Sequence, residues 1–543
     1  MYRMHILIGM DAHTIAQGAR AVKESLVKTI EAAGLVKEIK VIEAGSLGIY
    51  DQGVVMVVYP EGVYYANVTI DDVPEIVNNH LAKGRIVERL KFKEKITDAA
   101  KGVSALPSRV AKQVRIVLKN AGTIDPNNID EYIANGGYEA LGKVLTSKKP
   151  QDVIQTIIDS KIVGRGGAAF PTGLKWKFAA QEKDDTKYLI CNADEGEPGT
   201  FKDRLILEGD PHSIIEAMAI AGYAVGASEG YIYIRGEYHQ SIEKIQRAIN
   251  QANDENLLGK NIFNSGFNFN LKIREGAGAY VCGEESALIE SIEGKRGEPR
   301  DKPPFPTQAG LWGKPTVVNN VETLANIPQI ILNGAEWFKQ IGTDTCFGTK
   351  VFTLIGNIYN PGLIEVPMGT TLREIIYDLG QGIADGKKFL VAQTGGTTGG
   401  LLTESGLDVP MAYDTLKEYG TGLGSGALLI VDDSHCIVDL VKNFVEFFNH
   451  ESCGKCTLCR EGTGRLLELL NNITSGNGKV SDIDLIEKLS LIMKRGAFCG
   501  LGQAAPTPIL GSLKHFKEEY MAHIEGKVCR KGVCNMGEKK KAA

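Results

Sequence analysis

The chain has 543 residues, of which 43% are hydrophobic and 23% are charged, and its net charge at neutral pH is -5. A chain of this length folds into several domains, and we expect three or four. The acidic balance, with a pI near 6.1, argues against a nucleic-acid-binding groove and against a polybasic membrane anchor.

Targeting signals are also missing from the sequence. No apolar stretch reaches the roughly 18 residues that a membrane-spanning helix needs, and the first residues lack the apolar core of a signal peptide. Ten cysteines in a chain of this length indicate metal ligands and buried thiols rather than a disulfide framework. We therefore expect a cytoplasmic protein with no direct membrane span.

The first 92 residues alternate strand and helix patterns. Strands are expected at 4–8, 38–43 and 53–58, and a helix at 15–33. Residues 93–129, rich in Lys, Arg and Ala, predict a helical connector, because they nearly lack the aromatic side chains that a nucleic-acid surface uses for stacking.

Residues 130–335 show the pattern of a large α/β domain. Strands expected at 188–191, 230–235 and 269–274 are separated by amphipathic helices, expected at 213–224 and 240–252.

The last third of the chain changes character. From 336 to 432, short strands and glycine-rich turns around one helix at 371–379 predict a small β-rich domain. From 433 to 522 the helical periodicity resumes, and we expect a bundle with helices at 438–448, 464–472 and 481–494, followed by a tail at 523–543.

Four cysteines in the bundle carry the strongest chemical signal. Cys453, Cys456 and Cys459 have the spacing C-x2-C-x2-C, and Cys499 follows at a distance. Three thiolates on adjacent turns and one from a separate loop suit a 4Fe-4S cluster. The alternative is a four-thiolate zinc site, but zinc usually takes its thiolates as two C-x2-C pairs. The motif thus favours a cluster and electron transfer.

A second group of metal-ligand side chains flanks the bundle: Cys436, His523, Cys529 and Cys534. Three thiolates and one imidazole could bind zinc tetrahedrally and tie the tail to the bundle. The alternative is that these thiols are simply buried or free.

A glycine-rich loop at 164–176 leads into a helical segment. Its backbone N–H groups, with Arg165 and Lys175, could bind phosphate oxygens. The spacing fits neither the dinucleotide fingerprint nor the P-loop, and alone the loop could equally be a structural turn.

Acidic residues follow the strand ends. The loop at 192–199 comes directly after one strand, and the acidic loop at 280–285 follows the glycines of 275–278. Carboxylates there could accept hydrogen bonds from ribose hydroxyls or from a flavin ring, whereas the plainer alternative is two ordinary acidic turns. Together with a cluster, the three loops predict a flavin and nicotinamide site.

These loops, with residues 294–306, 310–323 and 451–462, resemble the NADH-binding flavoprotein subunit of respiratory complex I. The resemblance is closest to its relatives in NAD-reducing and electron-bifurcating hydrogenases and transhydrogenases, and it covers roughly residues 130–520 in order. It implies FMN, NAD(H) and one 4Fe-4S cluster in an α/β multidomain fold. The implied domains are a degenerate thioredoxin-like domain at 1–92, a Rossmann-like FMN/NADH domain at 130–335, a β-grasp domain of the soluble ligand-binding type at 336–432 and the cluster-bearing helical bundle at 433–522.

Matching motifs carry the family's binding residues to this chain. For FMN the resemblance implies Gly164, Arg165, Gly166, Lys175, Asn192, Asp194, Glu195, Tyr280, Gly283, Glu284, Val318, Asn319, Asn320 and Thr323. For NADH it implies Gly167, Ala168, Phe170, Lys175, Phe178, Glu197, Glu285 and Phe305.

The resemblance also implies a mechanism. Hydride would pass between NADH and FMN without a catalytic side chain, and single electrons would pass to the cluster. Glu197 and Glu285 would accept hydrogen bonds from ribose hydroxyls and repel a 2′-phosphate, which favours NADH over NADPH. An NADP(H)-linked version of the same subunit is the alternative.

The sequence departs from these relatives at its N-terminus. Relatives of the hydrogenase type hold a 2Fe-2S cluster there on four cysteines, but residues 9–19 and 45–51 contain no cysteine. We therefore expect this unit to be a scaffold that docks a partner. We also expect no ferredoxin-like domain after the bundle. We expect partners, namely a 2Fe-2S thioredoxin-like subunit and a larger iron–sulfur catalytic subunit such as a hydrogenase, formate dehydrogenase or transhydrogenase module. The rival from another class is a non-catalytic scaffold subunit that binds zinc.

Overall fold

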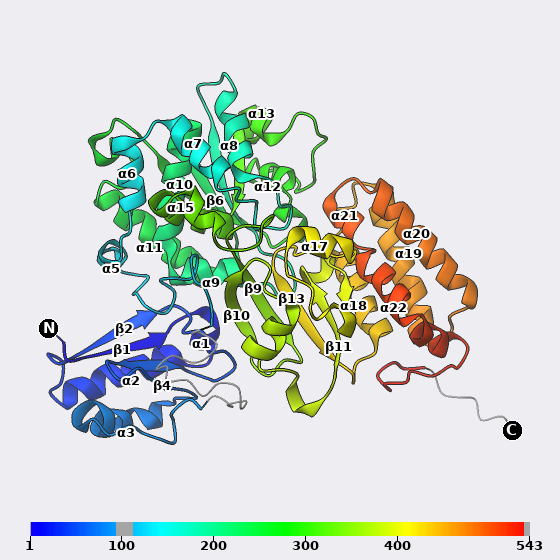
Figure 1. Cartoon of the computed structure of the whole chain (residues 1–543), viewed down its shortest axis with the longest axis horizontal. Coiled ribbons are helices and arrows are strands. Elements are labelled where there is room, and N and C mark those ends of the chain that lie inside the picture. The colour runs from blue at the N-terminus through cyan, green and yellow to red at the C-terminus, as the bar shows by residue number, and fades with distance from the viewer. Residues whose placement is uncertain (1, 94–111, 537–543) are drawn as a thin grey trace.

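The computed structural model describes residues 2–93 and 112–536, which form three β-sheets and a group of C-terminal helices (Figure 1). The first sheet, blue in the figure, lies at the lower left below the second sheet and its helices. The third sheet, yellow-green, stands in the middle, between the second sheet and the orange and red C-terminal helices.

The first sheet has the strand order β2-β1-β3-β4, in which β1 and β2 are parallel and the other pairs are antiparallel. The helix expected at 15–33 is two helices, because Gly18 lies between them with a φ of 101°. The elements are β1 (Met4–Gly9), α1 (Ala12–Ala16), α2 (Ala19–Ala32), β2 (Ile39–Ala44), β3 (Met56–Tyr59), β4 (Val63–Tyr65), η1 (Ile70–Asp72), α3 (Val73–Glu75) and the π-helical η2 (Ile76–Leu81).

The second sheet is parallel, with the order β7-β6-β5-β8. The chain winds from β5 through β6 to β7 and then returns to β8 on the other side of β5. Ligands of open α/β sheets bind at such a reversal, at the carboxyl ends of the strands. The elements are α5 (Ile129–Ala134), α6 (Glu139–Ser147), α7 (Pro150–Asp159), α8 (Thr172–Gln181), β5 (Tyr188–Ala193), α9 (Lys202–Gly209), α10 (Pro211–Val225), β6 (Glu229–Arg235), α11 (His239–Asp254), η3 (Ile262–Asn264), β7 (Asn270–Gly276), η4 (Tyr280–Gly283), α12 (Glu285–Ile292), α13 (Pro306–Ala309), η5 (Leu311–Gly313), β8 (Thr316–Asn320), α14 (Val321–Ala325), α15 (Ile327–Asn333) and α16 (Ala335–Lys339).

Buried contacts hold the first sheet against α9 and α11. The ammonium of Lys244 donates to the carbonyl oxygens of Met10, at 3.3 Å, and of Glu208, at 2.9 Å. Gly45 lies so close to Gly209 that a Cβ atom added to Gly45 would be 2.7 Å from the Gly209 Cα. The loops of the first sheet are therefore packed backbone to backbone on the second unit.

The third sheet has the order β10-β9-β13-β11-β12, in which β9 and β13 are parallel and the other pairs are antiparallel. The helix expected at 371–379 is present as η6, but α17 is a second, unexpected helix. The elements are β9 (Thr349–Gly356), β10 (Gly362–Pro367), the π-helical η6 (Glu374–Leu379), η7 (Ala384–Gly386), β11 (Phe389–Thr394), η8 (Gly396–Thr398), β12 (Leu401–Leu402), η9 (Glu404–Gly406), α17 (Tyr413–Glu418) and β13 (Ala427–Asp432).

The periodicity predicts the first three C-terminal helices, each of which is somewhat longer than expected, whereas the helices at Gly500–Ala504 and Thr507–Ile524 were not predicted. In α18 the apolar side chains of Val438, Val441, Val445 and Phe448 recur every three or four residues and are fully buried. The helices are α18 (Ile437–Glu451), α19 (Thr457–Thr474), α20 (Val480–Gly496), α21 (Gly500–Ala504) and α22 (Thr507–Ile524).

The helical connector expected at 93–129 is wrong in the part that the structure describes, and residues 94–111 lie outside it. Residues 112–128 form turns instead of a helix. The carboxylate of Glu365, in β10, accepts hydrogen bonds from the backbone N–H groups of Ile116 and Val117, both at 3.0 Å, and of Leu118, at 2.9 Å. A side chain far along the chain thus accepts the hydrogen bonds of N–H groups that would bond within a helix.

None of the helices in residues 2–93 and 112–536 is long and apolar enough to cross a membrane.

Replacing Glu365 with Ala should destabilise the contact between this segment and the third sheet. Three buried N–H groups would lose their acceptor, so we expect the free energy of unfolding to fall by about 3 kcal/mol. Urea denaturation measures this, with the exposed Glu404→Gln as the matched control. An unchanged urea midpoint in Glu365→Ala would contradict the role of this carboxylate.

Candidate functional site

Two adjoining cavities, of about 670 and 380 Å³, lie at the carboxyl ends of β5 and β8. Volumes of this size are typical of sites for cofactors. The residues that line both cavities come from the three glycine-rich or acidic loops and from the end of β8, and are Gly166, Ala168, Asn192, Gly283, Glu284 and Asn320.

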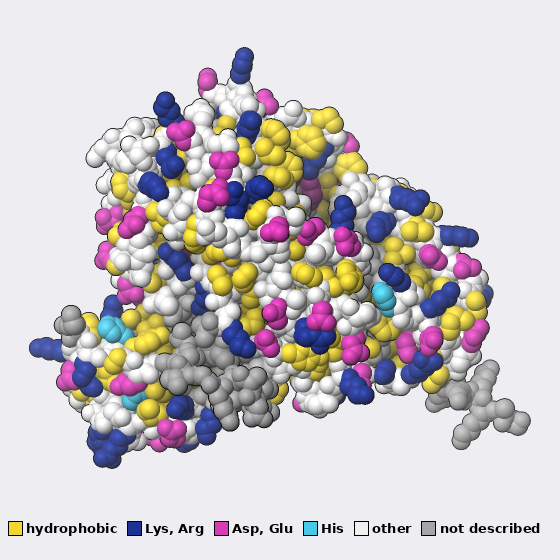
Figure 2. Space-filling view, viewed as in Figure 1, with side chains coloured by type: hydrophobic (Ala, Val, Ile, Leu, Met, Phe, Trp, Pro, Cys, Tyr) yellow, Lys and Arg dark blue, Asp and Glu magenta, His cyan; other side chains and the backbone are white. Residues whose placement is uncertain are grey.

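Aromatic rings surround the larger cavity. Phe170, Phe178 and Phe305 line it, and 43%, 45% and 51% of their surfaces are exposed. Figure 2 shows hydrophobic side chains gathered over α8 and α13 beside a hollow of the surface. Exposed rings at a cavity mouth can stack on a flat ligand, whereas ordinary core residues would be buried.

An ionised carboxylate lies inside the larger cavity. Glu285 accepts hydrogen bonds from the ammonium groups of Lys175, at 2.9 Å, and of Lys302, at 3.1 Å. Although burial opposes it, the charges of these two lysines lower the pKa of Glu285. The carboxylate is therefore charged at neutral pH and can accept further hydrogen bonds.

The smaller cavity contains a carboxyl group without a partner. The Oδ2 atom of Asp194 is buried and makes no hydrogen bond among the described residues. Burial raises the pKa of Asp194 to about 7. A polar ligand in this cavity could supply the missing hydrogen bond.

The carboxylate of Glu197 is held by several hydrogen bonds within the protein. Its carboxylate accepts hydrogen bonds from the hydroxyls of Tyr280, at 2.9 Å, and Thr397, and from the Thr398 N–H at 3.2 Å. Among the described residues it lines the smaller cavity and not the larger one, where the aromatic rings lie. Its oxygens are thus engaged by a loop of the third sheet.

Of the flavin and nicotinamide residues expected from the sequence, all but Arg165 line one or both cavities. The Arg165 side chain is 1% exposed, and its guanidinium donates to the carbonyl of Phe347 at 2.6 Å. The structure does not bring this side chain into the lining of either cavity, because the guanidinium joins the second unit to the segment before β9. Its backbone N–H donates to Thr323 Oγ1 at 2.8 Å.

The sequence interpretation missed residues that the third sheet and nearby loops contribute. Thr398, Gly424 and Ser425 line the smaller cavity, and Lys302 lines the larger one. The dense glycines of 395–400 and 420–426 were a usable signal, but they are also typical of simple turns.

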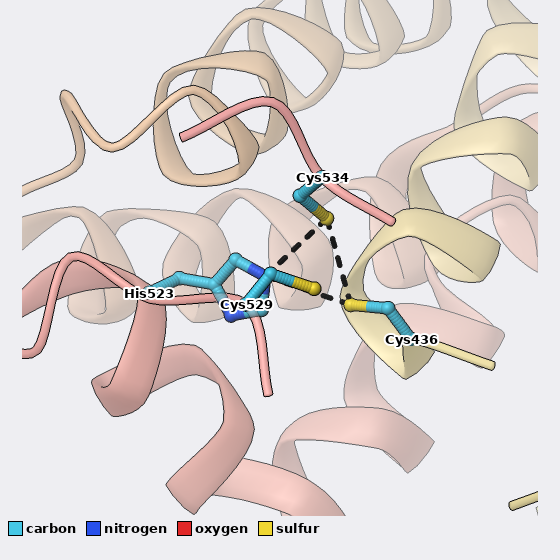
Figure 3. Close-up of side chains that lie close together, drawn as sticks. All are labelled: Cys436, His523, Cys529 and Cys534. Carbon is cyan, nitrogen blue, oxygen red and sulfur yellow. Dashed lines mark hydrogen bonds between the residues drawn. The ribbon is translucent and has the colours of Figure 1, made fainter. Parts of the chain in front are cut away.

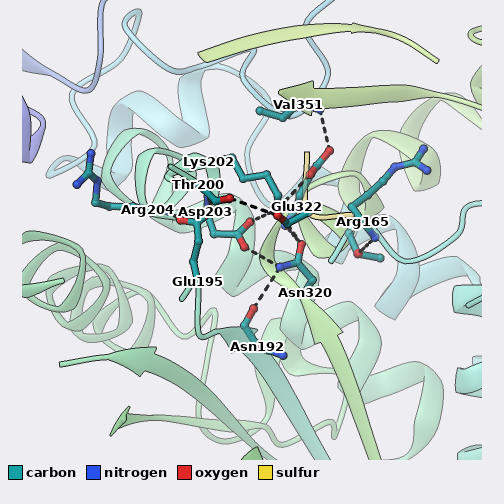
Figure 4. A network of polar contacts seen from close by, with 12 residues as sticks. Arg165, Asn192, Glu195, Thr200, Lys202, Asp203, Arg204, Asn320, Glu322 and Val351 are labelled. Atoms are coloured by element: carbon teal, nitrogen blue, oxygen red, sulfur yellow. Dashed lines mark hydrogen bonds and ion pairs between the residues drawn. The ribbon is translucent and has the colours of Figure 1, made fainter. Parts of the chain in front are cut away.

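A network of buried charges lies behind the cavities (Figure 4). The carboxylate of Glu322 pairs with the ammonium groups of Lys202, at 3.1 Å, and Lys350, at 2.5 Å, and all three side chains are fully buried. Lys202 and Asp203 also bond the side-chain amide of Asn320, at 3.2 and 2.7 Å. The network fixes Asn320 at the cavity wall.

The four cysteines of the cluster motif lie in α19 or in the short segments that precede α19 and α21. Cys456 and Cys499 precede α19 and α21 as their N-caps, and Cys459 is 5% exposed. Cys499 also lines the smaller cavity, together with Asp194, Glu195 and Tyr280. One continuous cavity therefore reaches from the acidic loops to a cluster cysteine.

Four other side chains from α18, α22 and the tail converge as a second group (Figure 3). The ligand atoms of Cys436, His523, Cys529 and Cys534 all lie within 4.8 Å of one another. Within the described segments the four cluster cysteines do not form so tight a group. A single ion requires such close ligands, whereas four irons hold their thiolates farther apart.

Comparisons with known proteins agree with this geometry. Residues 157–329 match the Nuo51 FMN-binding domain, and residues 439–523 match the NADH-ubiquinone oxidoreductase-F iron-sulfur binding region. The NADP-reducing hydrogenase subunit HndC of Solidesulfovibrio fructosivorans is 55% identical over 78% of this chain and 86% of its own. An NADH-quinone oxidoreductase subunit of Escherichia coli is 45% identical over 73% of this chain and 90% of its own. This chain belongs to the family of NADH-quinone oxidoreductase subunits that carry the Nuo51 FMN-binding domain.

A solved structure extends the similarity to the whole fold. The NAD+-reducing [NiFe]-hydrogenase in its H2-reduced state matches with a TM-score of 0.68 and 30% identity, over 96% of this chain and 84% of that one. The chain is thus an NADH-dependent oxidoreductase subunit of the electron-entry type, with FMN and a 4Fe-4S cluster, and it works within a complex that has iron–sulfur partners. The residues of the site fit FMN and an iron–sulfur cluster. Glycine backbones and the unpartnered carboxyl of Asp194 line the cavities, and the four cluster cysteines lie nearby.

The raised pKa of Asp194 predicts that the flavin-free protein becomes less stable as the pH rises. Because its pKa is about 7 when folded and about 4 when unfolded, the folded chain binds a proton that the unfolded chain has released, and stability falls as the pH rises from 4 to 7. Asp194→Asn should therefore raise the thermal unfolding midpoint more at pH 8 than at pH 5. The exposed Asp254→Asn is the control, and an equal gain at both pH values would refute the prediction.

Proposed function

We propose that FMN and NADH occupy the two adjoining cavities, with FMN at the carboxyl ends of β5 and β8 and NADH toward the aromatic rim. The proposed cluster ligands are Cys453, Cys456, Cys459 and Cys499. FMN, when bound, exchanges a hydride with NAD(H) and single electrons with the cluster. The observation that carries the proposal is that Cys499 and the acidic loops line the same cavity.

The side chains of the chain bind and orient rather than react. The rings of Phe170, Phe178 and Phe305 offer flat surfaces at the cavity mouth, and the ionised carboxylate of Glu285 offers a hydrogen-bond acceptor inside it. Orientation of this kind supplies a large part of the rate of a two-centre reaction. No side-chain base is needed for this exchange.

NADH is the coenzyme that we propose. The ionised Glu285 can accept hydrogen bonds from ribose hydroxyls and repels a 2′-phosphate. NADP(H) is the second candidate, because Lys175 and Lys302 neutralise that carboxylate in the same cavity, and because the relative at 55% identity is named as part of an NADP-reducing hydrogenase.

The domain assignment is part of the proposal. The first sheet is a thioredoxin-like unit without cluster ligands, the third sheet is a β-grasp unit, and the C-terminal helices carry the cluster. Since the first 190 residues contain no cysteine, a separate 2Fe-2S subunit and a larger iron–sulfur catalytic subunit would continue the electron path. We place this complex in the cytoplasm, and the direction of electron flow depends on the catalytic subunit.

Metal, sulfide and flavin analysis of the anaerobically purified protein tests the function. We expect about one FMN and four irons per chain, and stopped-flow spectra in which NADH bleaches the flavin faster than NADPH does. Glu285→Gln should improve bleaching by NADPH, because it removes the repelling charge. No flavin after reconstitution, or zinc in place of iron, would refute the electron-entry site and support the zinc-binding scaffold. Equal rates with NADPH before and after Glu285→Gln would favour the NADP(H)-linked version.

We also propose that Cys436, His523, Cys529 and Cys534 bind zinc. Cys436 Sγ lies 3.7 Å from Cys534 Sγ and 3.5 Å from His523 Nε2, close to the edges of about 3.8 and 3.5 Å that tetrahedral Zn–S and Zn–N bonds produce. The other ring nitrogen of His523 bonds the carbonyl of Glu519 at 2.7 Å, which orients the imidazole. Although burial opposes it, backbone N–H groups of residues 531, 533 and 534 lower the pKa of the Cys529 thiol to about 6, which favours its thiolate.

Zinc should be found at about one per chain in addition to the irons. Cys529→Ser should lose this zinc and make the segment after α22 sensitive to protease, because the metal ties it to α18. Cys346→Ser, at a buried thiol of the third sheet, is the matched control and should keep the zinc. Full zinc content in Cys529→Ser would rule out the site.

A further inference from the structure

The hydroxyl of Ser452 lies against the sulfur of a proposed cluster ligand. Ser452 Oγ is 3.2 Å from Cys459 Sγ, and it also accepts the backbone N–H of Gly454 at 3.3 Å. Ser452 is the C-cap of α18 and directly precedes Cys453. The hydroxyl is thus held between the end of a helix and the first turn of the cluster loop.

The protonation state of a ligating cysteine determines which atom donates the hydrogen bond between Ser452 and Cys459. A cysteine that ligates iron has lost its proton, so its sulfur can only accept a hydrogen bond. The Ser452 oxygen receives the N–H of Gly454, and its own proton is left to point at Cys459 Sγ. In the loaded protein Ser452 is therefore the donor.

The burial of Cys459 strengthens the electrostatic effect of this hydrogen bond. With 5% of its surface exposed, Cys459 is buried, while the other three cluster cysteines are only partly so. Gly502 packs on it so closely that a Cβ atom added there would lie 3.0 Å from the Cys459 Cβ. A hydrogen bond shielded from water has a stronger electrostatic effect than an exposed one.

The residue before Ser452 contacts the flavin side. The Glu451 carboxylate accepts the backbone N–H of Tyr280 at 3.0 Å, and Tyr280 lines the smaller cavity. Two consecutive residues therefore contact the cavity lining and a cluster ligand.

We propose that Ser452 tunes the reduction potential of the cluster by donating its hydroxyl proton to the Cys459 thiolate. The hydrogen bond withdraws negative charge from the sulfur and stabilises the reduced cluster, so it raises the potential. Electron flow from the cavity to the cluster becomes more favourable as a result. The inference rests on the ligand assignment under Proposed function.

Redox titration of the cluster, followed by electron paramagnetic resonance in the anaerobically purified complex, tests the role. Ser452→Ala should shift the midpoint potential to a more negative value, and a smaller fraction of the cluster should be reduced at a fixed ratio of NADH to NAD+. Ser452→Thr keeps a hydroxyl and should stay near the wild-type potential. Ser475→Ala removes a serine hydroxyl at the other end of α19, about 24 Å from Cys459 along the helix, and should leave the midpoint potential unchanged.

Ser452→Val makes the test robust, since valine has the shape of threonine without the hydroxyl. A wild-type midpoint in Ser452→Ala or Ser452→Val with four irons retained would overturn the proposal. Loss of iron from both hydroxyl-free variants would also overturn it, because the hydroxyl would then hold the cluster rather than tune it. A wild-type protein without iron or a cluster signal would instead refute the proposed function, so the two failures are distinguishable.

Discussion

The site depends on one buried carboxylate that two parts of the chain share. Glu322, in α14, pairs with Lys202 from α9 and with Lys350 from β9, and none of the three side chains reaches solvent. Removing one partner of such a group leaves a buried charge uncompensated, which costs about 3–5 kcal/mol. The second and third sheets are therefore joined at a fixed geometry, and Asn320, which bonds the same network, is held at the cavity wall.

Tyr280 extends this rigidity to the cluster side. Its hydroxyl bonds Glu197, which a loop of the third sheet also holds, and its backbone N–H bonds Glu451 at the end of α18. Its ring packs on Phe447 of the same helix, with the ring centres 5.2 Å apart. The cavity lining cannot move relative to the cysteine loop without breaking several of these contacts. Single-electron transfer needs this constancy, because it depends on two groups staying close.

The sequence predicted what local pattern determines. The strands β5, β6 and β7 and the helices α18, α19 and α20 follow from periodicity, and the cluster motif follows from the cysteine spacing. The cavity-lining loops of the second unit were found because their glycines and carboxylates cluster in the sequence. The directions of single side chains were not predictable. Arg165 turns to a carbonyl at Phe347, and Glu197 turns to Thr397, partners that lie far along the chain. The segment at 112–119 contains several helix-forming residues, but tertiary bonds to Glu365 override that propensity, and the turn residues of 120–128 follow it.

The contact between Gly45 and Gly209 limits which residues position 45 can accept. A Cβ atom added to Gly45 would lie 2.7 Å from the Gly209 Cα, at the end of α9. Any larger residue there, a cysteine included, would push the first sheet away from the second unit. A metal ligand therefore cannot be introduced at this position without disturbing the packing that holds the two units together.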